Sequence, residues 1–409
     1  MFRRNIEPYL QSVLRDTPVV LLNGARQTGK STLAQEIAAQ RAGRYVTLDD
    51  ATTLAAAVGD PHGFLRNLPG MVVVDEVQKA PGLFPAIKIL VDADRRPGRF
   101  LLTGSANVLL LPQLSESLAG RMEAIPLWPL SQGELADRVE RFIDTVFAPR
   151  LPDFSNTEKT GIDILSQIIG GGYPEAVARE DTGRRQAWFG AYITAILQRD
   201  VRDLAHIEGL TDMPRLLALL AARSGGLLNM SELSRASAIA HTTLKRYLSL
   251  LEMTFLFQPL PAWSTNLGKR LVKSPKIHLI DSGLAAYLTG QTSQRLAEDA
   301  TLLGHLLESF VVAELRKQAS WAQERVSLYH FRSTTGREVD VVIEDARGRV
   351  VGVEVKATAS LTRKDLTGLE TLAQAAGDKF IRGVVLYGGD QVIPFGDQYV
   401  ALPVSALWR

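Results

Sequence analysis

The chain has no cysteine among its 409 residues, which excludes disulfide bonds, thiolate zinc sites and cysteine nucleophiles. It also has no long apolar run. The longest uncharged stretches, Phe100–Ser115 and Met253–Gly268, contain proline or asparagine and are shorter than the ~18–20 residues of a membrane span. The amino-terminal residues lack the apolar core and the cleavage site of a secretion signal. We therefore expect a cytoplasmic protein with no membrane partner.

A strong charge of either sign is missing as well, since the net charge is +2. Any surface that binds nucleic acid must therefore be local. No internal repeat or low-complexity tract occurs, and the 46% hydrophobic and 22% charged residues are ordinary for a globular protein. At roughly 100–200 residues per domain, the length predicts two to four domains.

Residues 1–135 alternate short apolar runs with segments of helical spacing. Such unbroken runs, separated by helices, predict an α/β domain whose parallel sheet is covered on both faces. We expect strands at Val19–Leu22, Tyr45–Leu48, Met71–Val74 and Phe100–Thr103, and helices at Lys30–Ala42 and Pro81–Ala93.

Three further regions follow. Residues 136–208 are mostly helical and are interpreted as a lid or linker, residues 209–290 contain helices followed by a basic segment, and residues 291–409 return to an α/β pattern. The last region therefore predicts a second α/β domain. Its expected helices are Thr301–Gln318 and Thr362–Ala376, and its expected strands are Ser327–Phe331, Glu338–Glu344, Val350–Lys356, Ile381–Tyr387 and Tyr399–Leu402.

Residues 24–31 read GARQTGKS and match the pattern G-x-x-x-x-G-K-[ST] of a phosphate-binding P-loop. The predicted strand before the motif and the predicted helix after it are the context that this motif requires. In such a loop the backbone N–H groups face phosphate oxygens, Lys30 reaches the β- and γ-phosphates, and Ser31 binds Mg²⁺. The expected nucleotide-binding residues are Gly24, Ala25, Arg26, Gln27, Thr28, Gly29, Lys30, Ser31 and Thr32.

A second motif, MVVVDE at residues 71–76, is an apolar strand that ends in two carboxylates. We expect Asp75 to hold Mg²⁺ together with Ser31, and Glu76 to polarise the attacking water. The alternative role for Asp75, a helix N-cap, leaves the apolar strand unexplained. The chain is therefore predicted to bind and hydrolyse ATP, with Lys30 and Glu76 as catalytic residues.

Small polar residues follow the strand expected at 100–103. In a P-loop sheet the neighbouring strand brings a polar side chain to the γ-phosphate, and Ser105 and Asn107 are the candidates. Arg121 follows a short amphipathic segment. It is either an arginine finger, and so a third catalytic residue, or a surface arginine in a salt bridge. Spacing alone does not separate these two roles.

The ordered motifs GARQTGKST, MVVVDEVQ, LLTGSANVLLLPQLSESLAGR and LWPLSQGE resemble a large group of poorly characterised prokaryotic AAA-type ATPases with a C-terminal domain of unknown function. The resemblance extends over nearly the whole chain, including Gly171–Glu175 and Leu197–Val201. It implies that ATP and Mg²⁺ bind at Gly24–Ser31 and Asp75–Glu76. A clear second-sensor arginine motif is missing, so the resemblance leaves open whether the chain forms a homo-oligomeric ring.

Two helices are expected at Ser231–Ala236 and His241–Leu251. The leucines of the second form an apolar stripe at i, i+4 and i+7, which turns its basic residues outward, as in the recognition helix of a winged-helix domain. No acidic residue occurs from Met253 to Ile280, which predicts a positively charged β-hairpin, the wing. Winged helices also bind proteins, so DNA is one of two expected partners. The candidate DNA-binding residues are Lys245, Arg246, Lys269, Arg270, Lys273 and Lys276.

In the last region, Glu308 lies on a predicted helix, Asp340 on a strand, and Glu354 and Lys356 on the next strand. Residues two apart point to one face of a strand, so Glu354 and Lys356 are expected together, with Asp340 beside them. Three carboxylates can hold Mg²⁺ or Mn²⁺. The series resembles the PD-(D/E)xK nucleases, which implies a restriction-endonuclease-like fold. The alternative is a salt bridge in a degenerate, non-catalytic copy.

The sequence therefore favours an ATPase that couples its nucleotide state to a C-terminal DNA-handling module. Two alternatives stay open. One is a nucleotide-regulated module that binds DNA or protein without cutting. The other is a toxin or defence component whose ATPase controls the nuclease-like domain.

Overall fold

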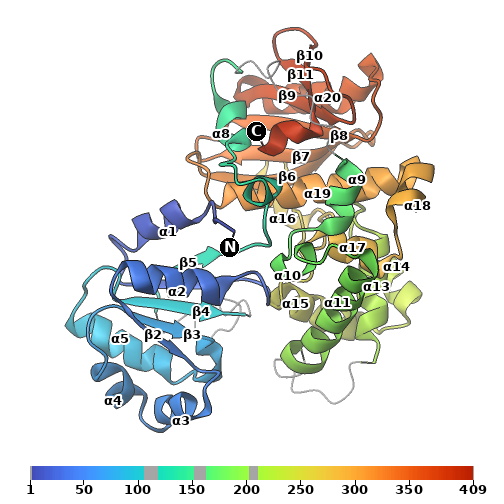
Figure 1. The fold of residues 1–409 in the computed structure, drawn as a ribbon. Coiled ribbons are helices and arrows are strands. Elements are labelled where there is room, and N and C mark those ends of the chain that lie inside the picture. Colours follow the sequence, from blue (N-terminus) through green and yellow to red (C-terminus); the bar gives the residue numbers. More distant parts are fainter. Residues whose placement is uncertain (1, 106–117, 152–162, 202–210, 409) are drawn as a thin grey trace.

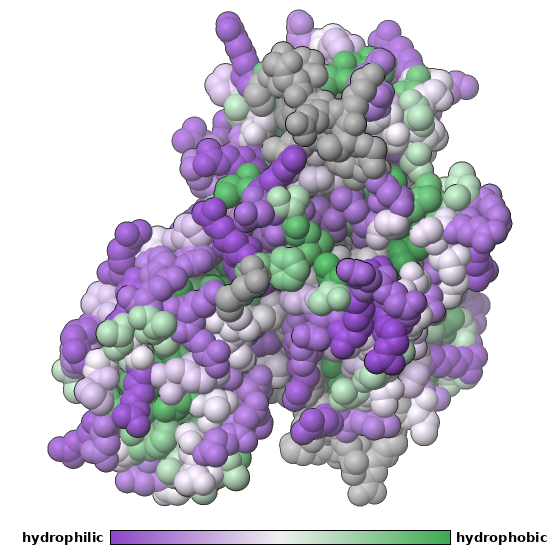
Figure 2. Space-filling view, viewed as in Figure 1, coloured by the Kyte–Doolittle hydropathy of each residue, from purple (hydrophilic) through white to green (hydrophobic). Residues whose placement is uncertain are grey.

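The structure is a computed structural model that describes residues 2–105, 118–151, 163–201 and 211–408. A five-stranded sheet lies at the lower left of Figure 1, a six-stranded sheet at the top, and a group of helices at the right. In the space-filling view, hydrophilic residues cover most of the visible face, and an indentation separates the amino-terminal domain from these helices (Figure 2). Among the described residues, no helix is long and apolar enough to cross a membrane.

The five strands of the amino-terminal sheet are parallel, in the order β2-β3-β4-β1-β5. Adjacent residues of one strand, such as Leu21 and Leu22, enter two different cores, because helices cover both faces. The predicted parallel sheet is therefore confirmed. Its elements are α1 (Glu7–Val13), β1 (Val19–Asn23), α2 (Lys30–Gln40), β2 (Arg44–Thr47), α3 (Ala51–Gly59), α4 (Pro61–Arg66), β3 (Val72–Asp75), α5 (Leu83–Ala93), β4 (Phe100–Gly104) and β5 (Met122–Pro126).

The middle of the chain is helical. Many of its helices share one continuous apolar core with the carboxy-terminal sheet, so the two regions pack as one body. The helices are α7 (Gln132–Leu135), α8 (Phe142–Phe147), α9 (Ile164–Gly170), α10 (Pro174–Val177), α11 (Thr182–Ala195), a π-helical turn (Ile196–Val201), α13 (Met213–Ala222), α14 (Met230–Ser237), α15 (His241–Met253), α16 (Leu267–Val272), α17 (Ser282–Leu288) and α18 (Ser293–Glu298).

The segment from residue 254 to 280, here called the wing segment, differs from the hairpin that the sequence predicted. It forms only isolated bridges, Phe257 to Leu279 and Leu260 to Lys276, and the short helix α16 lies between its two arms. A further bridge joins Ala262 to His330 in the edge strand of the carboxy-terminal sheet. The wing segment is therefore docked on that sheet.

The carboxy-terminal sheet is mixed, in the order β10-β11-β9-β8-β7-β6. Strand β8 runs parallel to β9 and antiparallel to β7. Helices α19 and α20 both pack on β8, and their apolar residues belong to two separate cores. The elements are α19 (Ala300–Ala319), β6 (Val326–Arg332), β7 (Glu338–Asp345), β8 (Val350–Lys356), α20 (Thr367–Ala376), β9 (Phe380–Tyr387), β10 (Ile393–Pro394) and β11 (Tyr399–Pro403). The expected helices and strands of this region are therefore present, with small shifts of their ends.

Candidate nucleotide-binding site and carboxylate cluster

The P-loop follows β1 and leads into α2. Gly24 has φ 154°, and a Cβ atom there would lie 2.2 Å from the Leu127 carbonyl oxygen, so the loop requires glycine. Gly29, with φ 92°, immediately precedes α2. The Lys30 ammonium group donates hydrogen bonds to the carbonyls of Gly24 (2.9 Å) and Ala25 (2.7 Å). The glycines and the lysine thus meet at a helix N-terminus, where backbone N–H groups favour an anion.

Asp75 ends β3, is 3% exposed, and is the centre of a hydrogen-bond network. It accepts hydrogen bonds from the hydroxyls of Ser31 (3.0 Å), Tyr45 (2.8 Å) and Thr103. Burial raises the pKa of Tyr45 to about 12, and the hydrogen bond to Asp75 adds to the shift, so the phenol remains a donor. The Ser31 and Asp75 oxygens are metal ligands of the kind that Mg²⁺ prefers.

Glu76 has a left-handed backbone, with φ 59° and ψ 45°, which is uncommon outside glycine. Its N–H group donates to the Thr103 hydroxyl (3.0 Å), and its carboxylate accepts hydrogen bonds from Ser105 (3.2 Å) and from the Gln78 amide. The structure thus places Ser105 beside the expected catalytic carboxylate. Asn107, the other candidate, lies outside the described residues.

Sequence reasoning missed Tyr45, Thr103 and Gln78. The strand order explains why, since β3 lies between β2 and β4 and so brings Tyr45 and Thr103 to Asp75. Thr103 had a usable signal, because it is a polar residue near the end of an otherwise apolar strand. Tyr45 had none without the strand order.

Arg121 lies at the amino-terminal ends of the strands, whereas the P-loop lies at their carboxy-terminal ends. Its carbonyl accepts a hydrogen bond from Val19, the first residue of β1, whereas the P-loop follows the last one. Five strand residues span roughly 15 Å. The guanidinium forms a two-point salt bridge with Asp92 (2.6 and 3.0 Å). The surface salt bridge is therefore present, and in this structure Arg121 lies far from the P-loop of its own chain. An action on a neighbouring subunit stays a prediction.

Two side chains from outside the predicted motifs bind the P-loop backbone. Arg4, which is 7% exposed, donates to the Thr28 carbonyl (2.7 Å) and forms a salt bridge with Glu134 (3.1 Å). Tyr192, on α11, donates to the Arg26 carbonyl (3.3 Å). The P-loop is therefore in direct contact with the amino terminus and with the middle helices.

The segment that follows β5, residues 127–135, is the junction segment, and it binds helix α19. Lys317 donates to the Leu130 carbonyl (2.9 Å), and Glu314 accepts from the Gln132 N–H group (2.9 Å). Both contacts use the backbone of the junction segment, so they constrain its path after the sheet.

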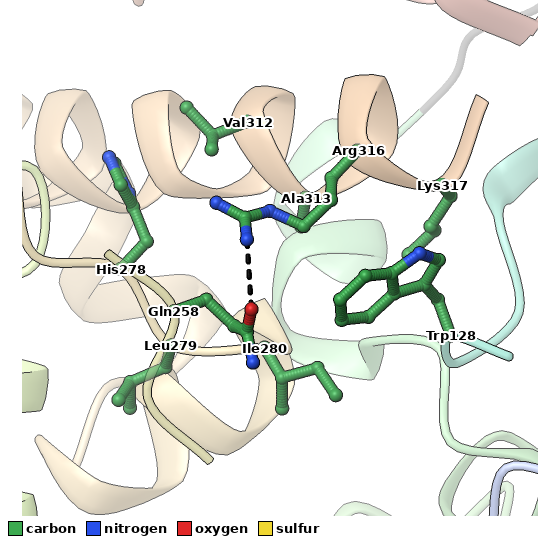
Figure 3. Close-up of a pocket in the computed structure, with 9 residues that line it drawn as sticks. All are labelled: Trp128, Gln258, His278, Leu279, Ile280, Val312, Ala313, Arg316 and Lys317. Carbon is green, nitrogen blue, oxygen red and sulfur yellow. Dashed lines mark hydrogen bonds between the residues drawn. The ribbon is translucent and has the colours of Figure 1, made fainter. Parts of the chain in front are cut away.

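A small cavity of about 10 Å³, room for roughly one water molecule, lies at the same junction (Figure 3). Arg316 of α19 lies over the Trp128 ring, 5.8 Å from its centre, and donates to Gln258 of the wing segment (2.8 Å). Helix α19 thus contacts the ATPase domain and the wing segment at one place.

Glu308, Asp340 and Glu354, here called the carboxylate cluster, are brought together as the sequence predicted. Lys356 donates to Glu354 (2.6 Å), and Asp340 accepts from the Val355 N–H group (3.0 Å). Burial raises the pKa of the Glu308 and Glu354 carboxyls, and the nearby Asp340 charge raises both further. The cluster is therefore a site where negative charge is crowded in a poorly solvated place.

One residue in this cluster was assigned wrongly from the sequence. Lys276, expected to be an exposed DNA contact, is 3% exposed and donates to Glu308 (2.7 Å) and Asp340 (3.0 Å). Burial alone lowers the pKa of Lys276, but the Asp340 and Glu308 carboxylates outweigh it and raise that pKa, so the lysine is charged. It cannot contact a phosphate from this position.

The expected metal site at the carboxylate cluster is not formed in this arrangement. Among the described residues, no group of three His, Cys, Asp or Glu side chains is placed to hold a metal ion. The physical reason is that the Lys276 ammonium group lies between Glu308 and Asp340, where a divalent ion would have to bind.

The other candidate DNA-binding residues differ in exposure. Lys245 and Arg246 on α15 are exposed, as expected, and so is Lys273. Arg270 is half-buried, forms a two-point salt bridge with Glu344 (2.5 and 2.8 Å), and so does not extend freely. Lys269 lies in α16, and its side chain is outside what the structure describes.

Three families match parts of the chain. Residues 16–136 match the AAA domain, residues 162–295 match a domain of unknown function (DUF8612), and residues 303–407 match another (DUF4143). Uncharacterized proteins of Mycobacterium tuberculosis and Mycobacterium bovis are each 33% identical over 412 residues, covering 99% of this chain and 84% of theirs. An uncharacterized protein of Haemophilus influenzae is 24% identical over 347 residues, covering 76% of this chain and 78% of its own.

Solved structures are more distant. A Walker-type ATPase of Pyrococcus abyssi is 17% identical, with 70% of this chain and 96% of that chain covered and a TM-score of 0.42. The Holliday junction branch migration motor RuvB of Thermotoga maritima is 16% identical, with 63% and 89% covered and a TM-score of 0.24. Likeness at these scores supports no further argument.

Proposed function

Since this chain belongs to the same family as the uncharacterized mycobacterial proteins and has an AAA domain, we propose that it hydrolyses ATP and transmits its nucleotide state to the carboxy-terminal domain. One observation supports hydrolysis most strongly. The Thr103 hydroxyl binds both the Asp75 carboxylate and the Glu76 N–H group, so the expected Mg²⁺ ligand and the expected water-activating residue are held together.

The residues of the P-loop fit Mg²⁺·ATP. Mg²⁺ would be held by Ser31 and Asp75, and when bound it neutralises charge on the β- and γ-phosphates. Lys30 exchanges its two loop carbonyls for phosphate oxygens. Glu76 exchanges the hydrogen bonds that it accepts from Gln78 and Ser105 for one that it accepts from the attacking water. Without nucleotide, the Glu76 carboxylate is thus held by Gln78 and Ser105, and the attacking water has to replace these hydrogen bonds.

Helix α19 supports the proposed coupling. Glu314 and Lys317 bind the junction segment, and Arg4 connects that segment, through Glu134, to the Thr28 carbonyl of the P-loop. Two turns earlier, the same helix provides Glu308 to the carboxylate cluster. A shift of the P-loop on nucleotide binding would therefore act on the carboxy-terminal end of a continuous helix whose middle reaches the cluster.

The proposed partner of the carboxy-terminal half is DNA. Support comes from the order of elements, in which α13, α14 and α15 precede the bridged wing segment as the helices of a winged-helix domain precede its wing. The exposed cations Lys245, Arg246 and Lys273 also support it. Replacing Lys245 and Arg246 with glutamine removes up to two phosphate contacts. The salt dependence of DNA binding should flatten by about two units. An unchanged slope would place the DNA surface elsewhere.

The ATPase proposal is tested by two substitutions. Lys30→Ala removes the counter-charge of the β/γ-phosphates and should abolish ATP binding. Glu76→Gln removes only water activation and should bind ATP but hardly hydrolyse it. Phosphate release and binding of a fluorescent ATP analogue measure the two effects. Hydrolysis by Glu76→Gln at the wild-type rate would show that another residue activates the water.

A second candidate function is a nucleotide-regulated binding module that does not cut DNA. The position of Lys276 favours it, because an ammonium group balances the carboxylates without metal. Incubation with linear, branched and single-stranded DNA, ATP and Mn²⁺ separates a module that only binds DNA from one that also cuts it. Binding without cleavage of any substrate supports the binding module.

A further inference from the structure

We propose that Tyr192 is a positioning residue of the nucleotide-binding site, whose hydroxyl fixes the Arg26 carbonyl and so turns the Gln27 N–H group toward the phosphates of ATP. Tyr192 belongs to α11 and lies 166 residues from Arg26 in the chain, outside every nucleotide-binding motif. The inference rests on the proposed function, since it concerns the ATP that the P-loop would bind.

The backbone of Gln27 is in a sterically disfavoured conformation. Its φ is 63°, in the left-handed region that residues other than glycine seldom adopt. The Gln27 side chain is exposed, so its own packing does little to hold this conformation. Contacts to the neighbouring peptide groups must therefore hold it.

The carbonyls of the two residues that flank Gln27 are each bound by a buried side chain. Tyr192 donates to the Arg26 carbonyl (3.3 Å), and Arg4 donates to the Thr28 carbonyl (2.7 Å). The C=O and N–H groups of a trans peptide point in opposite directions, so the held Arg26 carbonyl turns the Gln27 N–H group away from Tyr192. A loop that binds phosphate needs this arrangement, with carbonyls outward and N–H groups facing the anion.

Aromatic packing holds the Tyr192 ring beside the P-loop. The ring stacks on Trp188, with 5.0 Å between centres and 16° between planes, and it lies 4.8 Å from the Tyr173 ring. Its hydroxyl also contacts the Tyr173 hydroxyl (2.8 Å). Phenylalanine can fill the same space, so Tyr192→Phe removes the hydroxyl and keeps the packing.

The glycine-rich stretch before Tyr173 connects this aromatic group to the junction segment. The Gly172 carbonyl accepts from the Leu130 N–H group (2.7 Å), and a Cβ atom at Gly172 would lie 2.1 Å from the Leu130 carbonyl oxygen. Asp281 accepts from the Gly172 N–H group (2.7 Å). The orientation of the phosphate-binding backbone is thus tied, through Tyr192, to the packing of the middle helices on the junction segment.

The test measures binding of a fluorescent ATP analogue with Mg²⁺ to the full-length chain, together with the kinetics of phosphate release. Tyr192→Phe should weaken ATP binding by about threefold to tenfold, the effect of one lost hydrogen bond. KM should rise by the same factor while kcat changes by less than about twofold, because the N–H group binds the phosphates in the ground state and the transition state alike.

Tyr173→Phe is the matched control. Both variants lose the hydrogen bond between the two tyrosine hydroxyls, but Tyr173→Phe keeps the hydroxyl that binds Arg26. It should therefore lose stability in urea unfolding, while its ATP affinity stays within about twofold of the wild type.

The left-handed backbone provides a second test. Glycine adopts such a conformation without steric cost, so Tyr192→Phe should weaken ATP binding by a smaller factor in the Gln27→Gly background. This coupling is expected only if Tyr192 acts through the Gln27 peptide. If Tyr192→Phe does not fold, Gln27→Val should bind ATP more weakly than Gln27→Ala, because a β-branched residue disfavours the left-handed region more strongly.

Three results would overturn the inference. Equal ATP affinity of folded wild type and folded Tyr192→Phe would remove the role of Tyr192 and leave the ATPase proposal standing. An equally large loss of affinity in Tyr173→Phe would show that only packing is affected. If the wild type itself does not bind ATP, the proposed function fails, and the inference fails with it.

Discussion

Arg4 offers a direct test of how the P-loop is supported. The Arg4 side chain is 7% exposed, and the Glu134 side chain that it meets at 3.1 Å is fully buried. Arg4→Met keeps most of the apolar stem but leaves Glu134 buried without its cation, which costs about 3–5 kcal/mol. The lost hydrogen bond to the Thr28 carbonyl adds about 1 kcal/mol. We expect the free energy of unfolding of the AAA domain to fall by about 4–6 kcal/mol, the sum of these two costs. ATP binding should weaken because the loop loses its support.

Urea unfolding measures the first effect, and a fluorescent ATP analogue measures the second. The control is Arg3→Met, since Arg3 is exposed and its loss should change stability by less than about 0.5 kcal/mol. The double variant Arg4→Met, Glu134→Gln should be more stable than Arg4→Met alone, because a neutral amide is cheaper to bury than an unpaired carboxylate. A loss below about 1 kcal/mol for Arg4→Met, or no energetic coupling between the two sites, would refute the reasoning.

Three further predictions concern the ATPase domain and its junction with α19. Thr103→Val keeps the side-chain shape but removes the hydroxyl that binds Asp75 and Glu76. Stability should fall by about 1–3 kcal/mol, and the hydrolysis rate should fall more than the ATP affinity. Wild-type turnover would contradict the role given to this network. Arg121→Ala should be inactive alone and regain activity when mixed with Lys30→Ala if the arginine acts on a neighbouring subunit, since such a finger contributes ~10³-fold or more; activity that stays at zero in every mixture argues against it. Burial, and then the nearby Glu314 charge, raise the pKa of the Glu140 carboxyl to about 8, so the folded state binds an extra proton between pH 4.5 and about 8 and stability should fall as pH rises through that window. Glu140→Gln should flatten this dependence, and parallel stability curves for the two proteins would show that another group is responsible.

Local sequence patterns were sufficient for the elements around the P-loop and for the carboxy-terminal sheet. Apolar runs predicted β1, β3 and β4 because a strand covered on both faces has no polar side. The alternation around Glu354 and Lys356 predicted their common face, since neighbouring side chains on a strand point in opposite directions, and their neighbours Val353 and Val355 are buried.

Partners that are distant in the chain could not be predicted in this way. Arg4 and Tyr192 bind the P-loop from 24 and 166 residues away, and no periodic pattern connects them to it. The strand order, which places Thr103 and Tyr45 on either side of Asp75, likewise emerges only when the sheet forms.

Lys276 shows the difference most clearly. By itself, the sequence determined that this lysine lies in a basic segment free of acidic residues, and that pattern is typical of an exposed, nucleic-acid-binding surface. Only the tertiary structure brought it to Glu308 and Asp340, 32 and 64 residues further along the chain. Charge balance in a folded protein is decided by distance in space, because Coulomb energy and desolvation depend on the final packing of the groups and not on their order in the chain.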